Sequence, residues 1–162
     1  MIYTIHPSPL GDLLLTGERS ADGLLLASVT APGQRGAREP QDSWTRDDEA
    51  FASVTAQLDA YFAGDLKEFD LAFSATAGTA FQREVWAALD ALPYGATTTY
   101  GELNASLGGS PARARAIGAA IGANPLLIVR PCHRVVGADG SLTGFAAGLP
   151  AKELLLTLEG CR

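Results

Sequence analysis

The period of the hydrophobic pattern changes near residues 74–80, and this change constrains the fold more than any other feature of the chain. Upstream of it, apolar residues cluster in short segments separated by Gly-Asp and Asp-Gly turn pairs, at residues 2–5, 13–16 and 24–30. Downstream of it, apolar residues recur at helical spacing, as in Phe81, Val85 and Leu89. Strands followed by helices predict an α+β chain with two parts.

The first part, residues 1–74, is expected to form a small α/β lobe with an antiparallel sheet and one helix. The helix is predicted at residues 47–62, where apolar side chains recur at helical spacing and acidic residues occupy the first turn. Residues 69–73 alternate apolar and polar side chains, so we expect one more strand there. Residues 75–80 are small and weakly polar, which is typical of a linker.

The second part, residues 81–162, is expected to be a mostly helical domain. Thr99 followed three residues later by Glu102 is typical of a capping box at a helix start. That helix is short, and Pro111 begins a second one that ends before Pro125. Two short helices joined across a glycine turn predict a helix-turn-helix.

The second helix of this motif, residues 112–123, is built from Ala, Gly, Ile and Arg alone. Small side chains allow a close approach by another backbone. From composition, close packing inside the domain and insertion of the helix into a narrow nucleic-acid groove are equally good interpretations. In the second case an arginine of this helix would reach into the groove.

The end of the chain predicts a hairpin and a final helix. Short apolar segments at residues 135–136 and 142–143 flank Asp139 and Gly140, which favours a hairpin. The final helix begins at Pro150 and ends at Glu159, which lies four residues after Leu155 and so faces inward. A carboxylate at a helix C-terminus opposes the helix dipole by about 0.3–1 kcal/mol. Two interpretations remain. Glu159 either contacts a positive or hydrogen-bonding partner, or lies at a solvated, frayed helix end.

The net charge of −6 argues against a general nucleic-acid-binding protein, but the charge is unevenly distributed. Residues 1–80 hold twelve acidic and five basic side chains, whereas residues 81–162 hold six and seven. Residues 103–138 contain four arginines and no acidic residue, which permits a small phosphate-facing surface. With two cysteines, no signal peptide and no apolar run of transmembrane length, we expect a cytoplasmic protein that does not enter membranes.

Cys132 is the candidate reactive group. It follows the apolar run at residues 126–129 and precedes His133, where a strand-like segment gives way to a turn. A cysteine–histidine pair by itself more often marks an inert core cysteine, because reactive thiols need an electropositive, partly open site. Arg130, His133 and Arg134 supply positive character around this cysteine.

The C-terminal half resembles the O6-alkylguanine-DNA alkyltransferases, also called methylated-DNA–protein-cysteine methyltransferases. The matching residues occur in the same order as in that family: Phe81-Gln82, Val85-Trp86, Pro93-Tyr94-Gly95, Thr98-Thr99-Tyr100, Arg115-Ala116-Ile117-Gly118, Asn124-Pro125, Pro131-Cys132-His133-Arg134-Val135, Gly140, Gly144-Phe145, Lys152, Leu155 and Glu159. The N-terminal lobe is similar only in Pro9-Leu10-Gly11 and in its order of strands and one helix.

The resemblance implies irreversible transfer of an alkyl group from O6-alkylguanine in DNA to Cys132, with O4-alkylthymine as a second candidate substrate. His133 would then act as the base through a water, and Glu159 would orient its imidazole. Asn124 would brace the helix end against the Cys132 turn, besides serving as a simple helix cap before proline. Because the thioether product is not hydrolysed, each molecule acts once.

The resemblance also assigns DNA contacts. The helix-turn-helix would bind double-stranded DNA in the minor groove, and Arg115 would fill the gap left by the flipped base, whose O6 is otherwise engaged in pairing. Tyr100 would support base extrusion and protonate the leaving guanine, and Phe145 and Ala146 would line the base pocket. Arg113 departs from the family, which often has a small residue at this position, and it would add a phosphate contact. The structural alternatives are a core aromatic for Tyr100 and a solvated arginine for Arg115.

Further differences from the family or from some of its members affect these expectations. Phe145 stands where tyrosine is common, and the missing hydroxyl removes a hydrogen bond worth about 0.5–1.5 kcal/mol, so we expect weaker base selection. Arg130 stands where an apolar residue is usual, and it either lowers the pKa of Cys132 or points to solvent. Residues 1–80 contain no cysteine and one histidine, His6, so we expect no metal site there. We also expect no cofactor, and a monomer in the absence of DNA.

Three other functions compete with alkyl transfer. A non-catalytic relative would bind alkylated DNA without reacting, but such proteins replace the cysteine that is intact here. A cysteine hydrolase would use Cys132, His133 and Glu159 on an acyl substrate, but it would have no use for Arg115 on an Ala/Gly helix. A DNA-binding regulator would leave the segment around Cys132 unexplained.

Overall fold

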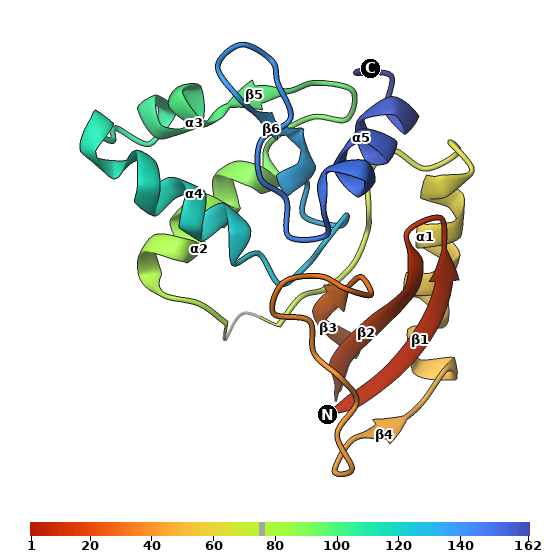
Figure 1. The fold of residues 1–162 in the computed structure, drawn as a ribbon. Helices are drawn as coiled ribbons and strands as arrows, with labels where there is room; N and C mark the ends of the chain where they lie inside the picture. The colour runs from red at the N-terminus through yellow and green to blue at the C-terminus, as the bar shows by residue number, and fades with distance from the viewer. Residues whose placement is uncertain (75–76) are drawn as a thin grey trace. The chain divides into compact units, whose positions relative to one another are not determined.

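The computed structural model describes residues 1–74 and 77–162, which form two compact units (Figure 1). The first unit contains Met1–Ala77 and Pro125–Val129, and the second contains Gly78–Asn124 and Arg130–Arg162. Two residues of the linker expected at 75–80, residues 75–76, lie outside the described residues. At its other end, the Thr79 side chain already caps the next helix by accepting from the Gln82 amide.

A four-stranded sheet of order β3-β2-β1-β4 forms the centre of the first unit. β1 (Ile2–Ser8), β2 (Gly11–Ser20) and β3 (Gly23–Thr30) are antiparallel and joined by tight turns, as the sequence predicted. β4 (Thr45–Arg46) was not predicted, and it pairs in parallel with the start of β1. The segment Pro125–Val129 returns to this unit, where the Val29 amide donates to the Pro125 carbonyl at 2.9 Å.

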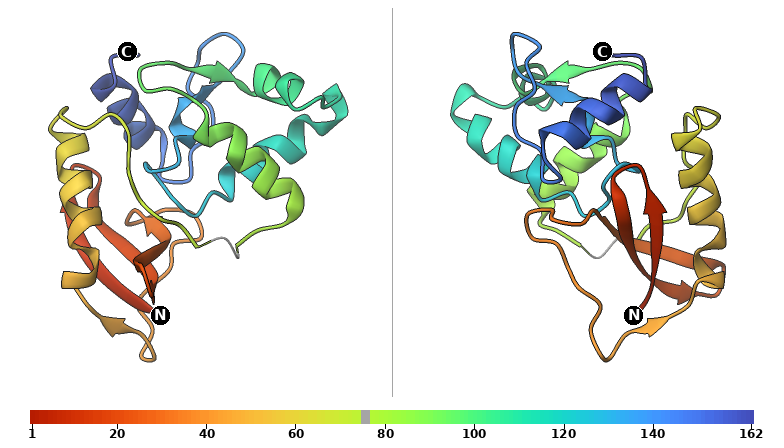
Figure 2. Two further views of the ribbon diagram at one scale, coloured as in Figure 1. Left: turned by 180° about the vertical axis from the view of Figure 1, so that it is seen from behind. Right: turned by 45° about the vertical axis from the view of Figure 1, so that its right-hand side comes forward.

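A helical segment covers one side of this sheet, because its apolar residues recur on one face. It begins as a 3₁₀ turn, η1 (Glu49–Phe51), and continues as α1 (Ala52–Phe62), which lies beside the sheet in both views (Figures 1 and 2). Phe51, Leu58 and Tyr61 from this segment are fully buried, as are Leu13 and Leu15 from β2. These residues form the core that the alternating and helical patterns predicted.

The extra strand predicted at residues 69–73 was wrong. This segment makes one isolated bridge, Leu26↔Phe73, in which the Leu26 amide donates to the Ala72 carbonyl at 2.9 Å. The Gln57 side chain of α1 occupies both backbone groups of Asp70, donating to its carbonyl at 3.0 Å and accepting from its amide at 2.8 Å. Because these groups are bonded to a side chain, they cannot extend a ladder along β3.

The second unit is mostly helical. In chain order its elements are α2 (Ala80–Asp90), β5 (Thr98–Thr99), α3 (Tyr100–Ser106), η2 (Pro111–Arg113), α4 (Ala114–Gly122), η3 (Cys132–Arg134), β6 (Val135–Val136) and α5 (Leu149–Leu158). α2 and α3 both pack against α4, and α5 contacts η3 (Figure 1). Among the helices of the described residues, none is long and apolar enough to span a bilayer.

The helix-turn-helix is present as α3, η2 and α4. Thr99 caps α3 by accepting from the Glu102 amide at 3.1 Å, but the Glu102 carboxylate accepts from the Thr98 hydroxyl, also at 3.1 Å. Gly109 fits between the helices because a Cβ at this position would lie 2.8 Å from Cγ of Asn104. The Asn104 amide donates to the Ser110 carbonyl at 2.8 Å and so holds the turn between the two helices.

The hairpin predicted around Asp139 and Gly140 was wrong in its pairing. A turn does form, with the Gly137 amide donating to the Ser141 carbonyl at 2.9 Å. However, β6 pairs in parallel with β5, in the register Thr98↔Val135 and Thr99↔Val136. The chain that leaves the turn runs to α5 without forming a strand. The local pattern predicted residues 142–143 as the partner of β6, but β5 is its partner instead.

Candidate functional site

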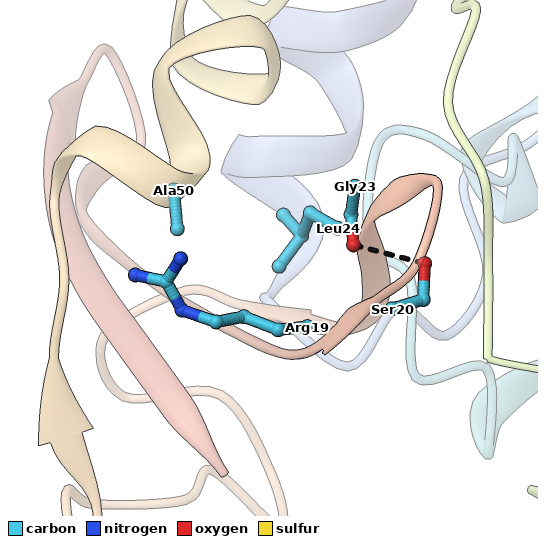
Figure 3. A pocket seen from close by; sticks show the side chains of 5 residues that line it. All are labelled: Arg19, Ser20, Gly23, Leu24 and Ala50. Carbon is cyan, nitrogen blue, oxygen red and sulfur yellow. Dashed lines mark hydrogen bonds between the residues drawn. The ribbon is translucent and has the colours of Figure 1, made fainter.

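A hollow of about 200 Å³ lies on the first unit, and its lining residues are Arg19, Ser20, Gly23, Leu24 and Ala50 (Figure 3). Arg19 is ion-paired with Asp47, and the Ser20 hydroxyl donates to the Gly23 carbonyl at 2.9 Å. The polar side chains that line this hollow are therefore engaged in contacts within the first unit. Among residues 1–74 and 77–162, no three His, Cys, Asp or Glu side chains gather as metal ligands would.

The candidate site lies in the second unit, where a tight turn presents Cys132 at the start of η3. The Cys132 amide donates to the Arg130 carbonyl at 2.8 Å, across Pro131, whose φ of −79° and ψ of 60° are those of an inverse γ-turn. The preceding chain is also tightly folded, since Ile128 has a φ of 72°. A β-branched residue rarely adopts this left-handed conformation, which marks the approach to Cys132 as strained.

Asn124 connects the end of α4 to this turn. Its side-chain amide donates to the Arg130 carbonyl at 3.1 Å, and the side chain also hydrogen-bonds with the Cys132 thiol. Burial raises the pKa of the thiol, while the Asn124 bond and the charges of Lys152 and Arg130 lower it in part. Since Cys132 is 7% exposed, burial dominates, and the thiol holds its proton until a base removes it.

His133 and Glu159 form a fully buried pair beside Cys132. His133 Nε2 lies 2.6 Å from Glu159 Oε2, and neither side chain is exposed. Burial lowers the pKa of His133, against the opposing effect of the Glu159 carboxylate, so the ring is neutral near pH 7. A neutral ring that donates from Nε2 to the carboxylate keeps a lone pair on Nδ1, which has no hydrogen-bond partner among the described residues.

Glu159 therefore has the partner that its place at the end of α5 indicated, and a second partner that sequence reasoning missed. Arg134 donates from Nε to Oε1 at 2.7 Å and from Nη2 to Oε2 at 3.1 Å. Its Nη1 donates to the Leu92 carbonyl at 2.6 Å. The sequence placed Arg134 only as local positive charge near Cys132. The available signal was the inward-facing carboxylate, because a buried charge needs a counter-charge.

Lys152 is a further group whose position sequence reasoning missed. It is fully buried on α5, and its Nζ donates to the carbonyls of Thr143 at 2.9 Å and Gly144 at 3.3 Å. Burial lowers the pKa of Lys152 to about 8, although the electrostatic interaction with Cys132 raises it in part. The lysine thus ties α5 to the loop that carries Phe145 and Ala146, both half-buried.

Tyr100 begins α3 and faces the same loop. Its hydroxyl donates to the Thr143 carbonyl at 3.2 Å, and the Lys152 Nζ lies 5.9 Å from its ring centre. The loop at residues 143–146 is therefore held from two sides, by α3 and by α5. Tyr100, Phe145 and Ala146 belong to neighbouring parts of one unit, which the sequence could relate only through family resemblance.

The two arginines predicted to contact DNA have different surroundings. Arg115 lies exposed on α4, on a helix whose neighbouring residues at positions 114 and 116 are alanines. Arg113 is half-buried at the end of η2, and its guanidinium lies 4.7 Å from the Phe81 ring centre. Arg115 is thus free to reach a ligand, whereas Arg113 is held against α2.

Comparisons with known proteins cover both units. The family model for the 6-O-methylguanine DNA methyltransferase, ribonuclease-like domain, matches residues 1–75, and the model for the DNA binding domain of that methyltransferase matches residues 80–161. A methylated-DNA–protein-cysteine methyltransferase from Methanosarcina acetivorans is 48% identical over 99% of both chains. One from Mycolicibacterium paratuberculosis is 46% identical over 97% of this chain and 91% of its own.

A solved structure supports the same assignment. The Mycobacterium tuberculosis OGT in complex with DNA superposes with a TM-score of 0.87 and 43% identity, covering 98% of this chain and 92% of that one. The α+β fold, with a small lobe and a helical domain, is therefore confirmed. The chain belongs to the 6-O-methylguanine DNA methyltransferase family, the methylated-DNA–protein-cysteine methyltransferases.

Proposed function

We propose that this protein repairs double-stranded DNA by transferring the alkyl group of O6-alkylguanine to Cys132, once per molecule. The observation that supports this most is the buried chain of contacts beside the thiol. Cys132 adjoins His133, whose Nε2 lies 2.6 Å from a carboxylate that Arg134 also holds. Such a charged cluster is costly to bury, so a role beyond packing is expected for it.

The proposed reaction forms one bond and breaks another. The Cys132 thiol passes its proton through a water to Nδ1 of His133, and Sγ attacks the alkyl carbon as the carbon–O6 bond breaks. The guanine leaves with a proton delivered from the Tyr100 hydroxyl, which regains one from the protonated imidazole by way of solvent. Overall, the thiol proton ends on guanine and the alkyl group ends on sulfur as a stable thioether.

The helix-turn-helix would deliver the base to this site. Because O6 is engaged in base pairing inside a duplex, the nucleotide has to leave the stack before Cys132 can reach the alkyl carbon. The exposed Arg115 on α4, flanked by alanines, is suited to enter the minor groove and occupy the vacated space. Phe145 and Ala146 would line the pocket for the extruded guanine.

A mass measurement tests the proposal. The protein is incubated with a duplex carrying one O6-methylguanine, and its intact mass is recorded. We expect a gain of one methyl group per molecule, mapped to Cys132 by peptide analysis and absent in Cys132→Ser. Cys161→Ser is the matched control, because Cys161 is the second free cysteine, and it should gain the methyl group as the wild type does.

The other outcomes identify the competing functions. Binding of the modified duplex without a mass gain would identify a damage sensor, and repeated turnover of an ester would identify a hydrolase. A duplex carrying O4-methylthymine, tested in parallel, reports whether this second base is also a substrate. Either of the first two outcomes, when no methyl group is gained on Cys132, rules out alkyl transfer.

The role of Arg115 has its own test. Arg115→Ala should slow reaction with the duplex far more than reaction with free O6-benzylguanine, since only the duplex requires base extrusion. Arg35→Ala, on an exposed loop of the first unit, serves as the control and should change neither rate. Equal losses on both substrates would contradict the proposed insertion into DNA.

We further propose that the protein acts in the cytoplasm as a monomer when DNA is absent. A reducing compartment suits a thiol that must stay free, and both cysteines are unpaired. Light scattering of the DNA-free protein at micromolar concentration measures the oligomeric state, and a stable dimer would contradict the proposal.

A further inference from the structure

Arg130 lies immediately before the Cys132 turn, and its side chain is bound to α2. Its Nε donates to Asp90 Oδ1 at 3.1 Å, and its guanidinium lies 5.1 Å from the Trp86 ring centre. The arginine side chain is 12% exposed, so it neither points to solvent nor lies free. A guanidinium stacked on an aromatic face and paired with a carboxylate is held in one orientation.

The face of α2 that holds Arg130 is itself anchored. The buried Trp86 donates from Nε1 to the Ala120 carbonyl of α4 at 2.8 Å. Gly78 leaves room for this ring, since a Cβ at that position would lie 2.5 Å from Trp86 Cζ3. Trp86 is therefore a rigid support rather than a mobile surface ring.

The backbone of Arg130 supports the nucleophile directly. Its carbonyl accepts from the Cys132 amide at 2.8 Å and from the Asn124 side chain at 3.1 Å. Two donors on one carbonyl fix the peptide plane between Arg130 and Pro131, and this plane sets the direction in which Cys132 leaves the turn. One residue thus joins α2 through its side chain to Cys132 through its backbone.

We propose that Arg130 is a positioning residue for alkyl transfer, which fixes the Cys132 turn to α2 through Asp90 and Trp86. This inference rests on the proposed function, because it concerns the geometry of the same thiol. It adds a support that precedes Cys132 in the chain, whereas the His133–Glu159–Arg134 contacts involve residues that follow Cys132. Misplacing a reacting atom by about 1 Å can cost about a hundredfold in rate, so such a support has a measurable effect.

The test uses free O6-benzylguanine, which reports on Cys132 without DNA binding. Arg130→Met keeps an unbranched chain against Trp86 but removes the pair with Asp90, and Asp90→Ala removes the same pair from the other side. We expect the rate constant at saturating O6-benzylguanine to fall about tenfold in Arg130→Met and less in Asp90→Ala. The concentration giving half the maximal rate should stay within about twofold, because neither side chain is placed in the base pocket.

Two further measurements separate positioning from general destabilisation. The double variant should be no slower than Arg130→Met, and Arg130→Lys should recover part of the rate. Hydrogen exchange at the Cys132 amide should accelerate in Arg130→Met, while exchange in the middle of α4 stays unchanged. Arg83→Met is the matched control, because Arg83 also lies on α2 but its Nη1 donates to the Gly78 carbonyl at 2.6 Å.

The outcomes distinguish this inference from the proposed function. If the wild type reacts and Arg130→Met reacts as fast, Arg130 does not position the thiol and the inference is overturned. If the wild type reacts neither with O6-methylguanine in DNA nor with O6-benzylguanine, the proposed function fails. Hydrogen exchange at the Cys132 amide then decides alone whether Arg130 holds the turn, and unchanged exchange overturns that as well.

Discussion

Replacing Glu159 with glutamine tests the energetics of the buried charges beside the thiol. The carboxylate accepts from His133 at 2.6 Å and from two nitrogens of Arg134 at 2.7 and 3.1 Å. The side chains of Glu159 and His133 are 0% exposed and that of Arg134 is 8% exposed, so solvent cannot compensate for the loss. Glutamine has nearly the same shape but removes the negative charge and directs an amide at one of the donors.

The expected cost follows from what Arg134 keeps. After the change, its guanidinium retains the Leu92 carbonyl at 2.6 Å and the Tyr94 ring at 5.7 Å, but no counter-charge among the contacts described above. Removing one partner of a buried ion pair costs about 3–5 kcal/mol, and we expect the lower end because the glutamine oxygen still accepts one bond. At about 2–4 °C per kcal/mol for a chain of this size, the melting temperature should fall by about 6–12 °C.

Urea unfolding followed by tryptophan fluorescence measures this loss, with calorimetry for the melting temperature. Glu153→Gln is the matched control, because Glu153 is exposed on the same helix, and it should stay close to wild type. Arg134→Met combined with Glu159→Gln should lose less than the sum of the single changes, since each relieves the other's unpaired charge. A loss below about 1 kcal/mol for Glu159→Gln, or strictly additive losses, would refute this account of the site.

Three other predictions concern titration and packing. Burial lowers the pKa of His133, so below about pH 6.5 the unfolded chain binds a proton that the folded chain excludes. The free energy of unfolding should thus decrease from pH 7 to pH 5 in wild type, and by less in His133→Asn. The pKa of Lys152, lowered to about 8 from 10.5, gives a second window at higher pH in which stability also rises with pH. The free energy of unfolding should rise from pH 8 to 10.5 in wild type relative to Lys152→Met, as urea titrations across this range would show. If the two proteins show the same dependence on pH, the lowered pKa of Lys152 is contradicted. Gly78→Ala should destabilise the second unit by about 1–3 kcal/mol in urea unfolding, because its φ is 85° and the new methyl would meet Trp86. An unchanged midpoint would contradict the tight fit.

Much of the fold could be predicted because its signals are local. Helical spacing placed α1, α2 and α5, and the Thr99 cap set the start of α3. The errors were in strands, since pairing depends on which edge is nearby. Residues 69–73 alternate as a strand does, but the Gln57 side chain occupies the backbone of Asp70. Residues 135–136 pair with β5, which local pattern cannot reveal.

The sequence by itself determined the helices, the three long strands of the first unit, the place of Cys132 at a turn and the inward-facing Glu159 at the end of the last helix. These follow from periodicity, capping and glycine or proline positions, which act within a few residues. Only the tertiary structure decided the partners of the long charged side chains. Arg134 pairs with Glu159, Lys152 with two loop carbonyls, and Arg130 with Asp90 on α2. Such side chains can reach in many directions, and burial selects the partner only after helices distant in sequence have packed.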